Sequence, residues 1–337
     1  MARIITFGEI MLRLATPGHL RFSQTHEFEA TFGGGEANVA VSLANYGDDA
    51  QFVTALPGND IAKTCLAELR GLGVGVEFCI ESGDRIGIYY IEKGAVARPS
   101  KVIYDRKHSA FSEYDFSKTD VKKLLEGYTW LHLSGITPAL GTKCRDLILN
   151  CLKAAKEMNM TVSFDGNFRS TLWTWEEARD FCTLCLPYVN VLFGIEPYHI
   201  WKNEEDHSAG DVKDGIPFQP DFEQQEKVFQ AFADRYPNIK CIARHVRFAH
   251  SCSENSLMAY LWLNGKTYES KRLTFHILDR VGGGDAFVSG IIYGLMNEYT
   301  PEDTVNFGVA ASAVKHTIHG DGNITDDVSM IRHVMEM

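Results

Sequence analysis

Length, composition and charge place this chain of 337 residues among ordinary globular proteins. Hydrophobic residues make up 45% of it and charged residues 23%, which excludes a disordered or fibrous protein. Its net charge of −11, without a dense Lys/Arg block, argues against a nucleic-acid or membrane partner. A phosphate-bearing ligand would therefore need local positive groups, backbone N–H donors or a metal ion.

The first ten residues, MARIITFGEI, predict a cytoplasmic protein that begins with a buried strand. They contain one arginine, an acidic Glu9 and no long apolar segment, and no run of about 18 apolar residues follows later. Residues 4–8 form an apolar run typical of a buried strand. Residues 36–46 bring Ala37, Ala40, Val41 and Ala44 to one face of a predicted helix.

Two stretches near the N-terminus differ from this pattern. Residues 12–32 and 85–111 contain short alternating or aromatic runs that are broken by Gly and Pro. We interpret the two stretches as one antiparallel flap, a small β lid on a single domain that spans residues 1–337.

The second part of the chain alternates strand-like and helical segments. The strand-like runs lie at 130–133, 161–164, 189–193 and 239–243. This alternation predicts βαβ units and a mostly parallel sheet, with ligand chemistry at the carboxyl ends of the strands. Residues 202–227 are polar and contain Gly and Pro, so we expect a surface excursion there.

The eight cysteines are spread thinly along the chain. Cys182 and Cys185 form the only close pair, and no second pair or nearby His pair completes a zinc site. We expect reduced thiols that pack as small hydrophobic side chains.

Three consecutive glycines precede Asp285 in segment 279–285, DRVGGGD, and an apolar run typical of a helix follows. Backbone N–H groups at a helix N-terminus are unpaired, and glycine lets an anion approach them, so Gly282, Gly283 and Gly284 are expected to form an anion hole. A carboxylate placed there is expected to stay ionised and to accept a proton from a hydroxyl. The alternative is a tight turn in which Asp285 only caps the helix.

The residues around this motif exclude two common types of nucleotide-binding loop. No Lys-Ser/Thr follows the glycines, so a Walker A loop is excluded, and no G-x-G-x-x-G follows the first strand, so a dinucleotide fingerprint is absent. Ala286, Gly290 and Gly294 recur at a spacing of four, which predicts close packing of the helix against the sheet.

A second glycine cluster, FGGGEAN at 32–38, also opens a helix. Glycine there would let a ligand lie against the main chain, or would simply give a flexible joint between flap and core. Two glycine-rich helix starts in one α/β chain suit a site for two ligands.

The segments FGGGEANVAVSLANYG and RVGGGDAFVSGIIYG resemble the two signatures of the ribokinase-like (PfkB) carbohydrate kinases. The second signature usually has alanine where this chain has Gly283. The resemblance implies a three-layer α/β fold with a mostly parallel central sheet and a small β-sheet lid. It also implies ATP and Mg2+ as cofactors and Asp285 as the catalytic base.

Within that superfamily the chain most resembles the 2-keto-3-deoxygluconate kinases. The similarity lies in FGEIMLRL, RIGIYY at 85–90, RPSKVIYDR at 98–106, LSGI at 133–136, DGNFR at 165–169 and KHTIHGD at 315–321. It implies phosphorylation of the O6 hydroxyl of this sugar acid, and it implies a set of substrate-binding residues: Gly34, Tyr89, Tyr104, Arg106, Ile136, Arg169 and Asp321.

Elementary geometry supports some of these positions. Tyr104 and Arg106 are two residues apart on a predicted strand, so both would point to one face. Arg169 follows a strand end, where a guanidinium suits a sugar-acid carboxylate through paired N–H bonds. The alternatives are that each arginine is a surface ion-pair partner and that Tyr89 is a packing aromatic.

The chain departs from the family pattern in two places. The Asn-x-x-Glu motif that organises the metal shell corresponds to 194–197, GIEP, where only Glu196 could act on magnesium-bound water. The glycine-rich nucleotide loop is replaced by RHVRFAHSCSEN at 244–255. The nucleotide contacts of that segment therefore cannot be transferred residue by residue.

Other functions stay open from the sequence. A related kinase of fructose, ribose or 2-keto-3-deoxygalactonate is one alternative, and a catalytically silent ligand-binding homologue is another. We expect the partners to be a small sugar acid and ATP, and we expect a homo-oligomer formed through the lid, because exposed sheet edges otherwise aggregate.

Overall fold

The computed structural model describes residues 3–195, 198 and 221–337. A nine-stranded sheet forms its centre, in the order β14-β13-β12-β11-β10-β9-β1-β4, with β15 paired to β13. Neighbouring strands from β4 to β12 along this order are parallel, and the β13, β14 and β15 pairings are antiparallel. The predicted mostly parallel sheet is confirmed. The strands are β1 (Arg3–Phe7), β4 (Asp49–Val53), β9 (Trp130–Ser134), β10 (Thr161–Asp165), β11 (Val191–Phe193), β12 (Cys241–Ala249), β13 (Glu254–Leu263), β14 (Lys266–Glu269) and β15 (Leu273–His276).

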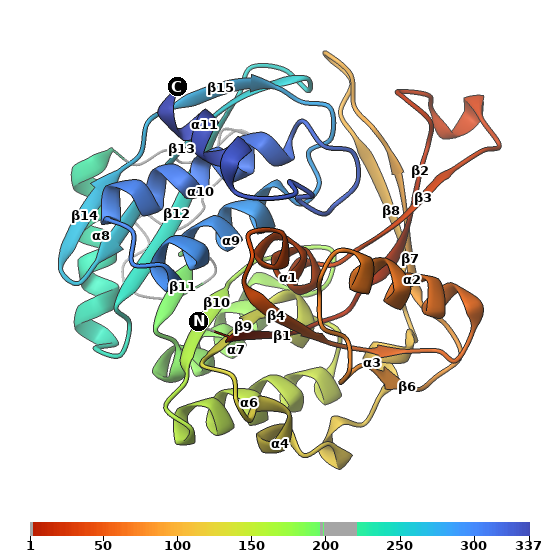
Figure 1. Cartoon of the computed structure of the whole chain (residues 1–337), viewed down its shortest axis with the longest axis horizontal. Helices are drawn as coiled ribbons and strands as arrows, with labels where there is room; N and C mark the ends of the chain where they lie inside the picture. The colour runs from red at the N-terminus through yellow and green to blue at the C-terminus, as the bar shows by residue number, and fades with distance from the viewer. Residues whose placement is uncertain (1–2, 196–197, 199–220) are drawn as a thin grey trace.

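Helices cover both faces of this sheet and give three layers (Figure 1). One face carries α1 (Gly35–Asn45), α2 (Asp60–Gly71), α9 (Gly283–Met296), α10 (Pro301–Lys315) and α11 (Ser329–Glu336). The other carries α4 (Val121–Leu125), α6 (Thr142–Glu157), α7 (Trp175–Cys185) and α8 (Phe222–Arg235). Alternate residues of β1 serve the two faces: Ile5 and Phe7 pack under α6 and α7, whereas Ile4 packs under α1.

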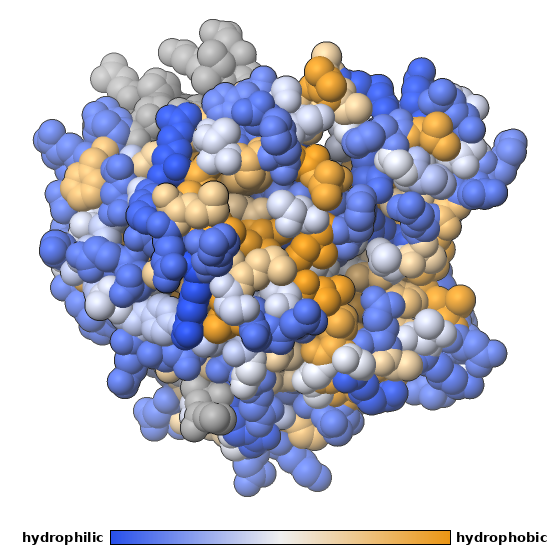
Figure 2. All heavy atoms as spheres, turned by 45° about the horizontal axis from the view of Figure 1, so that its top comes forward, coloured by the Kyte–Doolittle hydropathy of each residue, from blue (hydrophilic) through white to orange (hydrophobic). Residues whose placement is uncertain are grey.

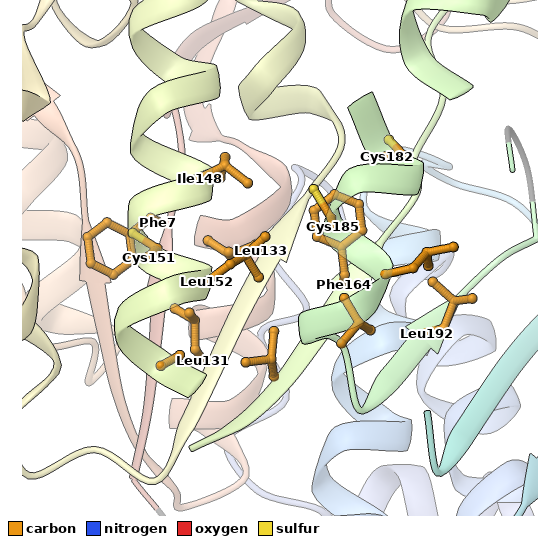
Figure 3. Packing of buried hydrophobic residues seen from close by; sticks show 14 of the residues in the cluster. Phe7, Leu131, Leu133, Ile148, Cys151, Leu152, Phe164, Cys182, Cys185 and Leu192 are labelled. Atoms are coloured by element: carbon orange, nitrogen blue, oxygen red, sulfur yellow. The ribbon is translucent and has the colours of Figure 1, made fainter. Parts of the chain in front are cut away.

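Cysteines contribute to the core as small hydrophobic side chains, as predicted. All eight are free thiols, and six of them are buried. Figure 3 shows Cys151, Cys182 and Cys185 among Leu133 and Phe164, in the layer between the sheet and helices α6 and α7. Burial raises the pKa of Cys182, so this thiol stays protonated and serves packing.

A second, four-stranded sheet projects from the side of the core (Figure 1). It contains β2 (Met11–Ala15), β3 (Glu29–Gly33), β7 (Gly87–Glu92) and β8 (Lys101–Asp105), all within or next to the two predicted flap stretches. The expectation of an antiparallel flap is wrong at its centre, since β2 and β7 pair in parallel while both outer pairs are antiparallel. The long connection through α1 and α2 brings β7 back in the direction of β2. A short parallel pair, β5 (Ala55–Leu56) and β6 (Ile80–Glu81), lies within that connection.

Two further expectations need correction. Residues 222–227 of the predicted surface excursion form the first turns of α8. Asp221 and Gln224 cap this helix, because the side chain of each accepts a hydrogen bond from the backbone N–H of the other. Residues 202–220 of the excursion lie outside the described residues. The two glycines of the predicted small-residue row in α9 face α10, because a Cβ at Gly290 would lie 2.8 Å from the Cα of Gly308 and a Cβ at Gly294 would lie 2.9 Å from the Thr304 Cγ2.

The visible surface in Figure 2 is mostly hydrophilic, with hydrophobic side chains gathered in a central band. Within residues 3–195, 198 and 221–337, no helix has both the length and the apolar character needed to cross a bilayer.

Candidate active site

A cleft of ≈ 940 Å³ opens at the carboxyl ends of the central parallel strands. Residues that follow β9, β10 and β11 and residues within β12 line it, together with the first turns of α1 and α9 and parts of the small sheet. Ligands of open α/β sheets bind at this edge, and the volume suits one large or two small ligands. The cleft thus lies at the edge of the sheet where the sequence predicted ligand chemistry.

Asp285 lies in the first turn of α9 and faces this cleft. Its Oδ2 accepts a hydrogen bond of 2.6 Å from the Asn38 Nδ2 in the first turn of α1. The same Asn38 amide accepts from the backbone N–H of Gly34 through Oδ1 at 3.4 Å, so its orientation is fixed by both neighbours. Gly282 is the residue that caps α9, and the alternative of Asp285 as an ordinary capping side chain finds no support in these contacts.

The helix start was expected to favour the ionised form of Asp285, but the pKa of this carboxyl shifts in the opposite direction. Burial raises the pKa of Asp285 to about 6, more than the hydrogen bond from Asn38 and the charge of Arg169 lower it. The carboxylate is still mostly ionised at pH 7, and its pKa is closer to that of an efficient proton acceptor than an ordinary aspartate's would be.

The glycines before Asp285 shape a bend that only glycine can make. Gly282 has a φ of 80°, and a Cβ there would lie 2.0 Å from the backbone oxygen of Asp321. A Cβ at Gly283 would lie 2.3 Å from the His316 ring, whereas Gly284 is exposed to the cleft. The backbone of this turn can thus come close to an anion, next to a carboxylate that can accept a proton.

Substrate residues predicted from α1 and the strand ends meet near Asp285. Gly34 caps α1, and a Cβ on it would lie 2.1 Å from the Glu9 backbone oxygen. A Cβ at the next residue, Gly35, would be 3.8 Å from both the Asp285 Oδ1 and the Ile136 Cδ1, so these groups border the same space. Arg169 follows β10, is exposed to the cleft and is close enough to Asp285 to affect its pKa.

The small sheet contributes a buried polar network at the other side of α9. The Tyr89 hydroxyl donates to Asp321 at 2.6 Å, and the Arg13 guanidinium donates to Asp321 at 2.7 Å and also to Asp279. All four side chains are buried. This network ties strands β2 and β7 to the loop before α9, which contains Gly282, and to the loop after α10, and it also holds Tyr89 and Asp321 beside the cleft.

Tyr104 lies near the end of β8, Arg106 follows the strand directly, and both line the cleft. The Tyr104 ring is 45% exposed and lies 6.0 Å from the Tyr89 ring. Arg106 is held by a buried Glu9, which also accepts from the Ser109 hydroxyl. Arg106 thus has the ion-pair partner that was the alternative to a ligand contact, and this pairing leaves it at the cleft wall in a fixed orientation.

Several residues of the site had no predicted role. Asn38 stood in the first glycine motif, and Asp165 directly followed the predicted strand at 161–164, so both carried a positional signal. Lys315 is a buried lysine at the end of the apolar helix α10, where its Nζ donates to the Ile318 backbone oxygen at 3.0 Å. Burial lowers the pKa of Lys315 to about 8, and its Cε would contact a Cβ at Gly282.

The predicted metal residue Glu196 lies outside the described residues. In the part of the chain that the structure describes, no three His, Cys, Asp or Glu side chains converge on one point. Mg2+ does not require such a cage, since it keeps several waters and binds one or two carboxylates together with phosphate oxygens. Asp165 lines the cleft, and burial followed by the charge of Asp285 raises its pKa to about 7, so a divalent cation beside it would be favoured.

Comparison with known proteins relates the chain to sugar kinases. The model of the pfkB family carbohydrate kinases matches residues 1–197 and 258–327, so the stretch that contains β12 is left unmatched. The crystal structure of 2-dehydro-3-deoxygluconokinase from Thermotoga maritima is 39% identical, covers 100% of both chains and superposes with a TM-score of 0.90. A 2-dehydro-3-deoxygalactonokinase from Haloferax volcanii is 32% identical over 95% of this chain and 92% of its own length. A 2-dehydro-3-deoxygluconokinase from Bacillus subtilis is 26% identical over 94% and 90%, respectively.

Proposed function

The chain belongs to the pfkB family of carbohydrate kinases, and we propose that it transfers a phosphoryl group from ATP to the O6 hydroxyl of 2-keto-3-deoxygluconate, also called 2-dehydro-3-deoxygluconate. The product would be 2-keto-3-deoxy-6-phosphogluconate, an intermediate of sugar-acid breakdown. The observation that carries this proposal is the arrangement of Asp285. It lies at the N-terminus of α9, is oriented by Asn38, and shares a large cleft whose described lining includes five arginines, Arg106 and Arg169 among them.

In the proposed reaction Asp285 accepts the proton of the O6 hydroxyl while the new bond forms between O6 and the γ-phosphorus. The bond from the γ-phosphorus to the bridging oxygen breaks, and ADP leaves. Backbone N–H groups of the Gly282–Asp285 turn would stabilise the negative charge on the transferring group. Mg2+, when bound to ATP phosphates and held through Asp165, would neutralise phosphate charge.

The acid end of the substrate would lie near Arg169 and Arg106. Arg169 is exposed to the cleft with no ion pair to a carboxylate among residues 3–195, 198 and 221–337, so its guanidinium is available for paired N–H bonds to a carboxylate. We interpret the small sheet as a lid whose closure over the acid would exclude water from the reacting phosphate. Tyr89, Tyr104 and Asp321 would contact the substrate from the lid side.

A second substrate, 2-keto-3-deoxygalactonate, is favoured by the name of the Haloferax volcanii relative. The two acids differ at one hydroxyl, at C4, which a site discriminates strongly only when it hydrogen-bonds that group. Both acids carry a carboxylate that can pair with the arginines, whereas neutral sugars such as fructose and ribose carry none.

The deciding experiment is coupled ADP release with Mg-ATP and a panel of the two keto-deoxy acids, gluconate, fructose and ribose. We expect turnover of the keto-deoxy acids and a KM for them that rises about 10- to 100-fold in Arg169→Gln. Arg179→Gln is the control, because Arg179 lies on α7, is paired with Asp180 and does not line the cleft. Turnover of neutral sugars alone would refute the acid assignment, and no turnover at all would favour a silent binding protein.

We further propose a cytoplasmic homo-oligomer that forms through the small sheet. Strand β8 is exposed along its whole length, and Val102 and Ile103 on it are 39% and 45% exposed. An apolar, unpaired edge strand is suited to a second copy of the same sheet. Light scattering after size exclusion tests this, since Ile103→Lys should shift the protein towards the monomer, and a monomeric wild-type protein would refute the idea.

A further inference from the structure

The cleft has a cationic wall formed by Arg247 of β12 and Arg280 in the loop before α9. Both side chains line the cleft, together with His245 and Arg244. Within residues 3–195, 198 and 221–337, no ion pair links Arg247 or Arg280 to a carboxylate, and the hydrogen bond found for Arg280 goes to the Cys252 backbone oxygen at 2.9 Å. Such a wall is unexpected in a chain with a net charge of −11.

The two arginines are close enough for their like charges to interact. Burial, followed by the charge of Arg280, lowers the pKa of Arg247. Like charges in a partly desolvated site repel one another, and an anion bound between them would remove the repulsion and add charge-assisted hydrogen bonds. Guanidinium groups suit phosphate oxygens in particular, because they donate two parallel N–H bonds.

The wall stands on one side of the anion-hole turn, away from the groups assigned to the sugar acid. A Cβ at Gly284 would lie 3.9 Å from the His245 ring, and only Val281 separates Arg280 from the turn. Asp285, in contrast, is bordered by Asn38, Ile136 and Arg169. The cleft thus has one end assigned to the sugar acid and a second end with the cationic wall. Asp285, the proposed proton acceptor, lies between them.

The backbone of β12 offers few free N–H groups for a phosphate, so a phosphate at this wall would have to bind to side chains. Residues 241–249 pair in continuous register with β13, which occupies backbone donors along that edge, and no glycine lies between 241 and 264. A loop of free N–H groups that could surround a phosphate is therefore absent from this described hairpin. The stretch is also part of the region that the family model leaves unmatched.

We propose that Arg247 and Arg280 bind the polyphosphate of the nucleotide donor, in place of a main-chain phosphate loop. This inference rests on the proposed kinase function and adds two side chains to it. The donor's phosphate chain would run along the wall and bring its terminal phosphate to the Gly282–Asp285 turn.

The test measures binding of Mg-ATP and of inorganic tripolyphosphate by calorimetry, and the KM of both substrates, in Arg247→Gln and Arg280→Gln. Each variant should weaken ATP and tripolyphosphate binding about 10- to 100-fold and leave the KM of the sugar acid within about twofold. The control is Arg272→Gln. Arg272 is exposed, lies over the Phe248 ring at 3.7 Å and does not line the cleft, so its loss should leave both affinities unchanged.

Conservative variants guard against a folding defect. Arg247→Lys and Arg280→Lys keep the charge but lose the paired donors, so a smaller loss of about three- to tenfold is expected. Unchanged ATP and tripolyphosphate binding in the glutamine variants would overturn the proposal. A rise in the KM of the acid with unchanged ATP binding would also overturn it, and would assign the arginines to the acid. If no sugar acid is phosphorylated but polyphosphate binding falls as expected, the proposed function fails while the phosphate site stands.

Discussion

Replacing Asp285 by asparagine should remove activity and stabilise the protein at the same time. A general base contributes about 10²- to 10⁴-fold, so we expect kcat to fall by about that factor. Raising a carboxyl pKa from 3.8 to about 6 costs about 3 kcal/mol of folding free energy at neutral pH. Asp285 is partly exposed, so a gain of about 1–2 kcal/mol in the neutral variant is the realistic expectation.

The pH dependence of that gain follows from the sign of the shift. Below the ordinary pKa of 3.8, Asp285 is protonated in both the folded and the unfolded chain, so the wild type and Asp285→Asn should be equally stable. As the pH rises through about 6, the wild type loses the stability that the protonated folded form provided, whereas the variant does not. The stability difference should therefore grow between pH 4 and pH 6 and stay constant above.

Coupled ADP release and thermal unfolding at pH 4 to 8 measure both effects. Asp303→Asn is the matched control, since Asp303 occupies the equivalent third position of helix α10, away from the cleft. That variant should keep full activity and lose a few tenths of a kcal/mol of helix-dipole stabilisation. Turnover of Asp285→Asn within tenfold of the wild type, or a stability difference that does not change with pH, would refute the reasoning.

Three further predictions concern the surroundings of this residue. Arg13→Met should destabilise the protein by about 3–5 kcal/mol, because it leaves two buried carboxylates unpaired, whereas Arg3→Gln removes an exposed ion pair and should cost at most about 1 kcal/mol in thermal unfolding. Gly282→Ala should reduce kcat at least 100-fold, because a Cβ would collide with a carbonyl oxygen 2.0 Å away. Gly18→Ala, with a positive φ but no atom within 4 Å, should cost only about 1 kcal/mol and leave kcat unchanged. The kcat/KM profile should fall about tenfold per pH unit below about pH 6, as Asp285 takes up its proton, and a flat profile down to pH 5 would contradict this role.

The sequence predicted the fold, and it predicted most of the residues that the structure brings to the cleft, because both depend on local patterns. Apolar runs bounded by turn residues are typical of buried parallel strands, and the carboxyl end of β10 carried Asp165 and Arg169 where the site was expected. Three glycines before Asp285 indicated a turn that opens a helix, and the structure has Gly282 at a φ that favours glycine. The predicted antiparallel pairing was wrong at the centre of the small sheet, because local alternation does not encode which strand lies next to which.

The electrostatic state of the site could not be predicted in the same way. From the sequence Asp285 was expected to be ionised by the helix N-terminus, yet burial outweighs that effect and raises its pKa. Burial depends on what covers the side chain, and that cover comes from distant segments. The same holds for Lys315, which lies beside Gly282 because α10 packs on α9.

The sequence by itself thus determined the element types, the helix start at Asp285 and the residues that resemble a sugar kinase, since each depends on neighbours within a few positions. Only the tertiary structure joined Asn38 to Asp285 across 247 residues and Arg13 to Asp321 across 308. It also placed Arg247 and Arg280 on one wall of the cleft. Contacts over such separations depend on the order in which strands enter the sheet and on which helices cover it, and no local pattern of residues specifies that order.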